Sequence, residues 1–161
     1  MAFDFDLIDY KKDLNARQKE NYNFQKISAV LADYGFVTIR LSDDWTGADF
    51  IALHISGKYL RVQLKARLSF SRKYEAQPDL YIAFPFNGEW YLYKHGELLQ
   101  KVLATTTIAK TESWSVRGGY SRGGLGGPFL ALLEPYRLLS KGTSGISDAV
   151  GLKRSRKRRT R

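Results

Sequence analysis

Apolar and polar residues alternate along residues 59–66 (YLRVQLKA), and Arg67 continues the alternation. Successive side chains of a β-strand point to opposite faces of the sheet, so this period of two predicts a strand with two unlike faces. The apolar face consists of Leu60, Val62, Leu64 and Ala66. The other face carries an amide, an amine and two guanidiniums, from Gln63, Lys65, Arg61 and Arg67. We expect a sheet whose first face is covered by a core and whose second face is either solvated or functional.

A helix is predicted before this strand, over residues 14–34. Phe24, Ile27 and Leu31 recur at steps of three and four residues, which places them on one face of a helix. Gly35 follows as a natural helix stop. The helix can therefore pack against the sheet through this apolar face.

Short strands and turns account for most of the remaining predicted structure. In chain order they are a strand at 36–41, a polar turn at 42–47, a strand at 48–54, a tight turn at 56–58, an apolar strand at 80–86, an Asn-Gly turn at 87–88 and its returning strand at 89–94. A short helix at 98–104, a glycine-rich loop at 118–127 and a final helix at 129–139, which Pro135 would kink or shorten, complete the list. This order of elements predicts α+β or mixed α/β architecture.

The composition excludes several classes of protein. The chain has 161 residues and no cysteine, so we expect one compact domain without disulfides, thiolate metal sites or a cysteine nucleophile. Asp4, Asp6 and Asp9 give the first residues the wrong charge for a secretion signal. No apolar run approaches the length of about 20 residues that a membrane span requires. We therefore expect a soluble intracellular protein, cytoplasmic, or nuclear if its source is eukaryotic.

Seven of the positive charges lie together at the C-terminus. They belong to Lys153, Arg154, Arg156, Lys157, Arg158, Arg159 and Arg161. The formal net charge is +10, so about +3 remains on the rest of the chain once these seven are subtracted. A run of like charges repels itself, and near a polyanion it adds affinity without sequence choice. We expect a single domain over residues 1–150 and a basic tail over 151–161 that contacts nucleic acid, with a merely solubilising tail as the alternative.

The polar face of the strand at 59–66 is expected to gain a carboxylate from the strand before it. Asp49 lies there among apolar residues, and hairpin pairing could bring it close to Gln63 and Lys65. Glu20, on the predicted helix, could supply a second carboxylate if the helix packs against the sheet. Carboxylate and amide oxygens are the hard ligands that Mg²⁺ prefers, so these residues are candidates for a metal site. The alternative is an ordinary solvent-facing sheet surface.

Together, Glu20, Asp49, Gln63 and Lys65 resemble the signature of the PD-(D/E)XK nuclease superfamily. That signature is an acidic residue that begins one strand and an acidic-x-lysine triplet in the next strand, often with a glutamate on the helix before them. The resemblance covers about residues 20–66. It implies an α/β, restriction-endonuclease-like core, in which helices flank a central mixed β-sheet.

Two positions depart from that signature. Ala48 stands where the eponymous proline would precede Asp49, a change that members of the superfamily tolerate. Gln63 replaces the usual acidic residue, and the resulting Gln-x-Lys triplet resembles that of some homing endonucleases of the superfamily. An amide oxygen still binds Mg²⁺ but brings no charge, so weaker metal binding is expected.

The resemblance implies a role for each of these side chains in phosphodiester hydrolysis. Asp49, Glu20 and Gln63 would hold Mg²⁺, or Mn²⁺ in its place, and the carbonyl of Leu64 would add a further ligand. Such an ion lowers the pKa of an attacking water and offsets charge on the phosphate. Lys65 would orient that water or stabilise the pentavalent phosphate.

The predicted function is that of a metal-dependent endonuclease acting on duplex or branched DNA. Arg61 and Arg67 would contact neighbouring phosphates, and RNA is an alternative partner. Because each domain carries one cutting centre and a duplex has two strands, the superfamily commonly works as dimers or tetramers, and a homo-oligomer is expected here. Two alternatives stay open. One is a binding module of the same fold that has lost cleavage, which Gln63 favours; the other is an RNA-binding accessory protein that uses the glycine-rich loop and the basic tail.

Several other signals have ordinary structural interpretations. Asp79 completes a literal Pro-Asp pair, but the triplet ten residues later has no lysine, so we expect it to start or cap the following strand. Asp43 and Asp44 are expected to make capping hydrogen bonds in a turn, although either could replace Asp49 as a ligand if the strand begins earlier. Both histidines of the chain lack a spaced partner and are interpreted as structural residues.

Overall fold

The computed structural model describes residues 4–140. Its elements, in chain order, are α1 (Ala16–Asp33), β1 (Phe36–Trp45), β2 (Ala48–His54), β3 (Tyr59–Leu64), β4 (Leu68–Ser71), the 3-10 helix η1 (Arg72–Tyr74), β5 (Leu80–Phe86), β6 (Glu89–Lys94), α2 (His95–Thr105), η2 (Ile108–Lys110), α3 (Glu112–Ser115), β7 (Gly119–Arg122), α4 (Gly127–Leu133), η3 (Glu134–Tyr136) and β8 (Arg137–Leu138). The expected domain boundary at residue 150 and the basic tail at 151–161 lie outside the described residues. Within residues 4–140, every helix is too short or too polar to cross a membrane.

The first helix has the buried face that its sequence predicts, together with a defined start. Asn15 accepts a hydrogen bond from the backbone N–H of Gln18 at 2.9 Å, and the Gln18 side chain accepts one from the backbone N–H of Asn15 at 2.9 Å. This capping box satisfies two of the N–H groups that a helix start leaves unpaired. Ile27 and Leu31, which belong to α1, are buried. The helix predicted in this part of the chain is confirmed.

Six strands form one mixed sheet in the order β1-β2-β3-β5-β6-β8. Neighbouring strands are antiparallel except β3 and β5, which run parallel with Arg61 opposite Leu80 and Leu64 opposite Ala83. A hairpin turn can only reverse the chain, so parallel neighbours need a longer crossover. The crossover here contains η1 and β4, and β4 pairs with β7 in a second, two-stranded sheet, called the β4–β7 ribbon below.

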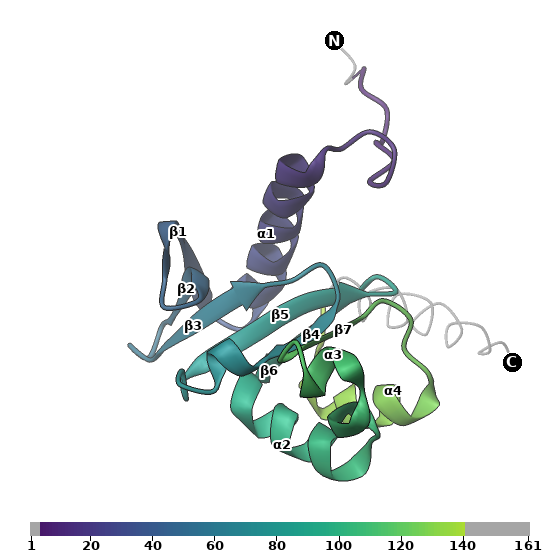
Figure 1. Ribbon diagram of the computed structural model, residues 1–161. Coiled ribbons are helices and arrows are strands. Elements are labelled where there is room, and N and C mark those ends of the chain that lie inside the picture. Colours follow the sequence, from purple (N-terminus) through teal and green to yellow (C-terminus); the bar gives the residue numbers. More distant parts are fainter. Residues whose placement is uncertain (1–3, 141–161) are drawn as a thin grey trace, which may run out of the picture.

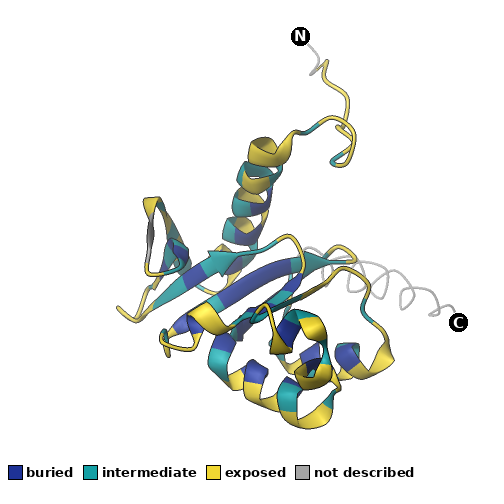
Figure 2. Ribbon diagram, in the orientation of Figure 1, coloured by how far each residue is buried: buried dark blue, intermediate teal, exposed yellow. Residues whose placement is uncertain are grey.

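Helices cover both faces of the six-stranded sheet (Figure 1). On one face α1 packs over a cluster that includes Ile27, Phe50 and Val62. On the other face α2, α3, α4 and the β4–β7 ribbon enclose a larger cluster around Phe84 and Tyr93. Figure 2 shows the buried residues concentrated in the central strands and on the helix faces turned toward them. The expected fold class, α/β with a central mixed β-sheet flanked by helices, is confirmed.

The polar turn expected at 42–47 is shorter than predicted. β1 continues to Trp45, which pairs with Ala48, so only Thr46 and Gly47 turn the chain, at φ 54° and 85°. A register shift within β1 separates this last pair from the regular ladder. Main-chain pairing across a hairpin does not require apolar side chains, which is why an acidic stretch can prolong a strand.

The glycine-rich loop expected at 118–127 contains a strand. Gly119–Arg122 forms β7, which pairs antiparallel with β4. The strand predicted at 59–66 ends earlier, at Leu64, and β4 begins after a short break. The residues of β4 (LSFS) alternate over only four positions, and those of β7 (GYSR) do not. No turn signal joins the two strands, because they come from distant parts of the chain.

The two later helices also differ in length from those predicted. α2 spans His95–Thr105 and so includes a turn more than the helix expected at 98–104. α4 spans only Gly127–Leu133, because Pro135 has no N–H and its ring clashes with the preceding turn. The chain then reaches the edge of the sheet as β8, beside β6.

Two buried side chains tie the β4–β7 ribbon to the six-stranded sheet. The Tyr93 hydroxyl donates a hydrogen bond to the carbonyl of Ser69 at 2.6 Å, and burial raises the pKa of Tyr93, which keeps this hydroxyl protonated. His95 Nε2 accepts a hydrogen bond from the backbone N–H of Ser71 at 3.1 Å. The ring of Tyr74 meets the His95 ring edge-on, and His95 Nδ1 is buried without a hydrogen-bond partner among the described residues. His95 is therefore a structural residue of the core, as its sequence context predicts.

The burial of His95 predicts a loss of stability in mild acid. Burial lowers its pKa from 6.5 to about 4. The unfolded chain takes up the proton at the ordinary pKa, so the stability that depends on neutral His95 is complete above pH 6.5, falls below it and is gone near pH 4. Between about pH 7 and pH 5.5 the free energy of unfolding should fall by on the order of 1 kcal/mol from this residue. Urea unfolding of the wild type and of His95→Gln measures the effect; equal pH slopes in the two proteins would contradict it.

Candidate functional site

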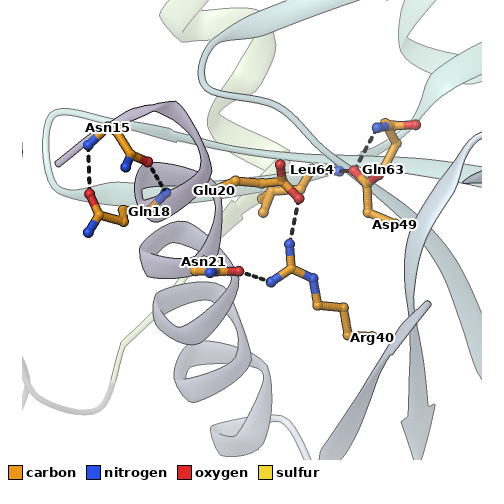
Figure 3. Close-up of polar contacts among 8 residues, drawn as sticks. All are labelled: Asn15, Gln18, Glu20, Asn21, Arg40, Asp49, Gln63 and Leu64. Atoms are coloured by element: carbon orange, nitrogen blue, oxygen red, sulfur yellow. Dashed lines mark hydrogen bonds and ion pairs between the residues drawn. The ribbon is translucent and has the colours of Figure 1, made fainter. Parts of the chain in front are cut away.

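The first two residues of β2 do not pair with β3 through the main chain. A side chain makes the contact between the two strands there. The last paired residues are Phe50 and Val62. Beyond them, Asp49 Oδ2 accepts hydrogen bonds from the backbone N–H of Leu64 at 2.7 Å and from Gln63 Nε2 at 2.6 Å (Figure 3). The carboxylate replaces the main-chain partner that Leu64 would find in a longer ladder. Asp49 is therefore held beside the triplet on β3.

Glu20 reaches the same part of the molecule from α1. Its Oε1 accepts a hydrogen bond from Arg40 Nη2 at 2.5 Å. The same guanidinium bonds to Asn21 and lies 5.3 Å from the centre of the Phe24 ring, so Arg40 is held against α1. Glu20 and Asp49 both line a cavity of about 890 Å³ between α1 and the first strands. Two carboxylates from distant parts of the sequence thus face one space.

The cavity has further charged groups on its wall. Arg17 and Asp43 line it as well, and Asp43 is exposed. The side chain of Asp44, the other alternative to Asp49, lies outside the described residues. Among residues 4–140 there is no group of three His, Cys, Asp or Glu side chains placed to hold a metal ion. A metal ion between Glu20 and Asp49 would therefore need a neutral oxygen as a third ligand.

Gln63 could supply that oxygen only in another orientation of its amide. In the structure its Nε2 faces Asp49, while its Oε1 accepts a hydrogen bond from the Tyr74 hydroxyl at 3.4 Å. Turning the amide over would bring Oε1 to the side of Asp49 and Nε2 to the side of Tyr74. Tyrosine hydroxyls accept as well as donate, so the second contact survives the exchange.

Lys65 lies apart from the two carboxylates. Its ammonium is 5.8 Å from the centre of the Tyr74 ring. Its side chain lines a depression of about 320 Å³ over the β4–β7 ribbon and not the cavity of Glu20 and Asp49. The structure thus places Glu20 and Asp49 on the wall of one cavity, bonds Gln63 to Asp49 and leaves Lys65 in the lining of a different hollow.

The two arginines of β3 and its extension have different surroundings. Arg61 Nη2 donates to the carbonyl of Thr46 at 2.9 Å and to Gln77 Oε1 at 3.0 Å, and Arg61 Nε is buried without a hydrogen-bond partner in the described part of the chain. This guanidinium joins the turn after β1 to the segment before β5. Arg67 is exposed. The predicted tail contacts Lys153, Arg154, Arg156, Lys157, Arg158 and Arg159 lie outside the described residues.

Two residues of the site have no predicted role in the sequence. Arg40 holds Glu20, and Tyr74 lies between Gln63 and Lys65. Arg40 could have been found, because the alternation of β1 turns it to the same side as the residues that meet α1. Tyr74 could not, because it lies in the crossover, where no periodicity indicates direction.

Comparison with protein-family models and with curated protein sequences finds no match to this chain. Among solved structures, a bacterial homing endonuclease, I-Ssp6803I, is similar with a TM-score of 0.43 and 11% sequence identity. The alignment covers 84% of this chain and 93% of that chain. A TM-score and a sequence identity this low show nothing about the site or its chemistry.

Proposed function

We propose that this protein is a metal-dependent endonuclease that hydrolyses phosphodiester bonds in duplex or branched DNA, as its resemblance to the PD-(D/E)XK superfamily implies. One observation carries the proposal. Asp49 and Glu20 come from a strand and a helix, they line the same cavity, and Gln63 is bonded to Asp49.

The oxygen atoms gathered at this place suit a hard divalent cation. In our proposal Asp49 and Glu20 contribute charged oxygens and Gln63 a neutral one, for Mg²⁺ or Mn²⁺. When bound, such an ion supplies an activated water and offsets charge on the phosphate. Arg40 neutralises Glu20 in the protein alone, so binding of a cation has to loosen this ion pair.

Lys65 is the residue we assign to the reacting phosphate. It follows Gln63 on the same face of the extended chain, and its ammonium rests against Tyr74. A cation beside a phosphate stabilises the negative charge that develops on it in the transition state. Glu20, Asp49 and Gln63 would therefore act on the water side of the reaction and Lys65 on the phosphate.

A nucleic-acid-binding module without cleavage is the second candidate, because the observed orientation of Gln63 favours it. Its Nε2 donates to the same Asp49 oxygen that a cation would take. RNA is an alternative partner for either function. An accessory protein that binds RNA through the glycine-rich loop is less well supported, since Gly119–Arg122 is paired within the β4–β7 ribbon.

Substitution of Lys65 separates cleavage from binding. In Lys65→Ala the cleavage rate with Mg²⁺ should fall by about 10²-fold or more, because the cation that stabilises the transition state is gone. Duplex affinity should change by less than about threefold, because affinity is spread over many phosphate contacts. Nicking of supercoiled plasmid and gel-shift binding measure the two effects, with EDTA as the metal-free control and Lys58→Ala, in the exposed turn before β3, as the matched variant.

Three outcomes of this experiment would count against the assignment. Equal losses of binding and cleavage in Lys65→Ala would make Lys65 a surface contact. Full cleavage in EDTA would remove the metal from the mechanism. A wild type that binds duplex but never cuts it, with either Mg²⁺ or Mn²⁺, would establish the binding module instead.

The metal site itself is tested by Gln63→Glu, without reference to activity. The change adds a charged oxygen beside Asp49 at nearly constant shape, and a divalent cation relieves the resulting repulsion. The affinity for Mg²⁺ should rise by about tenfold or more. Isothermal titration calorimetry measures it, with Gln100→Glu on the exposed side of α2 as the control for added charge. An unchanged affinity would show that Gln63 is not a ligand.

We further propose that the protein self-associates through an exposed apolar sheet face. This face consists of Val37, Ile39, Leu53, Ile55 and Tyr59, whose exposed fractions run from 41% to 85%. The pairing of Val37 with Leu53 and of Leu53 with Tyr59 puts their side chains on one side of the sheet, opposite α1. None of the five is charged, and an uncharged apolar face of this kind suits the core of a protein–protein interface. We assign this face to a second copy of the chain, because each chain would carry one cutting centre and a DNA duplex has two strands to cut.

Val37→Lys tests this interface. A charge on the apolar face should shift a dimeric or larger wild type toward monomer, because an unpaired ammonium resists burial. Val116→Lys is the matched control, since Val116 is also exposed but lies outside this face. Sedimentation velocity measures the oligomeric state, and a monomeric wild type at high protein concentration would exclude the proposal.

A further inference from the structure

The charged residues that line the depression over the β4–β7 ribbon are all positively charged. Its cations are Lys65 after β3, Lys73 in η1 and Arg117 after α3. No carboxylate lines it; the other lining residues are mainly serines, aromatics and glycine, within the described part of the chain. Three cations from three elements around one hollow of about 320 Å³ form an electropositive site without an anion of its own.

The cations are held only weakly by the protein. The ammonium of Lys73 lies 4.8 Å from the centre of the Tyr74 ring, and that of Lys65 lies 5.8 Å from the same ring. Arg117 pairs with Glu112 at 3.2 Å, but the two side chains are 72% and 73% exposed, and solvent screens such a pair strongly. All three cations can therefore turn to an incoming anion at little cost.

The floor of the depression is hydrogen-bonded to the six-stranded sheet and is rich in hydroxyl groups. Ser69 and Ser121 lie opposite each other on the ribbon with their Oγ atoms 3.2 Å apart. The ribbon is fixed from below by the Tyr93 hydroxyl on the Ser69 carbonyl and by His95 on the Ser71 N–H. Serine hydroxyls and backbone N–H groups are common partners of nucleic-acid phosphates.

We infer that this depression binds a phosphate of the nucleic-acid backbone next to the one that is cut. The inference rests on the proposed function, because Lys65 is shared between this site and the reacting phosphate. Lys73 and Arg117 are the residues that define the new site, and neither belongs to the metal centre. The two hollows are linked through the end of β3, because Gln63 is bonded to Asp49 of the cavity and Lys65, two residues further on, lines the depression.

Removal of two charges from the depression, compared with removal of two charges elsewhere, tests the inference. The test variant is Lys73→Gln with Arg117→Gln. The control is Lys26→Gln with Lys58→Gln, which loses the same charge, and the Lys26 ammonium also lies over a tyrosine ring. All four side chains are exposed, so both variants should fold like the wild type. Binding of the full chain to a short DNA duplex is measured over a salt series.

Each lost phosphate contact lowers the slope of log affinity against log salt by about 0.9 on duplex DNA. We expect the test variant to lose about one to two units of slope and about tenfold in affinity at low salt, and the control to stay close to the wild type. If the wild type binds and cuts duplex but the two variants behave alike, the inference is overturned and the proposed function stands. If the wild type does not bind duplex at all, the proposed function fails and the inference fails with it.

Discussion

Where main-chain pairing between β2 and β3 stops, the carboxylate of Asp49 accepts the next hydrogen bond from β3. The candidate site depends on this bond. Without Asp49, the backbone N–H of Leu64 would have no partner in the place where the ladder stops. The bond is part-buried, and a donor left unpaired away from water costs free energy, so the fold has its own reason to keep an acceptor here. Asp49 also lines the cavity that Glu20 reaches from α1. The residue that stabilises the strand end is thus the same residue that faces the proposed metal ion.

The polar face of β3 is not a solvated surface, although alternation alone would fit one. The crossover between β3 and β5 folds back over it and supplies partners. Arg61 bonds to Gln77, and Gln63 contacts Tyr74. Polar groups are tolerated here because they are hydrogen-bonded, and the half-buried Arg61 is held by the turn after β1 and by Gln77. Arg67, beyond the end of the strand, is exposed.

The two hollows near this strand end differ in charge. The cavity beside α1 has mixed charge, because the carboxylates Glu20, Asp43 and Asp49 line it together with Arg17 and Arg40. The charged residues that line the depression over the β4–β7 ribbon are all cations, namely Lys65, Lys73 and Arg117. The depression is therefore the more favourable of the two places for an anion.

The sequence by itself determined the first helix, the three antiparallel strands after it and the hairpin around Asn87-Gly88, because periodicity and turn glycines act over a few residues. It also brought Asp49 to Gln63, since hairpin pairing leaves little choice of register. The β4–β7 ribbon, the partners of Arg61 and the neighbours of Lys65 were decided only by the tertiary structure. Each depends on where the crossover after β3 runs, and that path is set by packing between segments far apart in the chain, which no local pattern encodes.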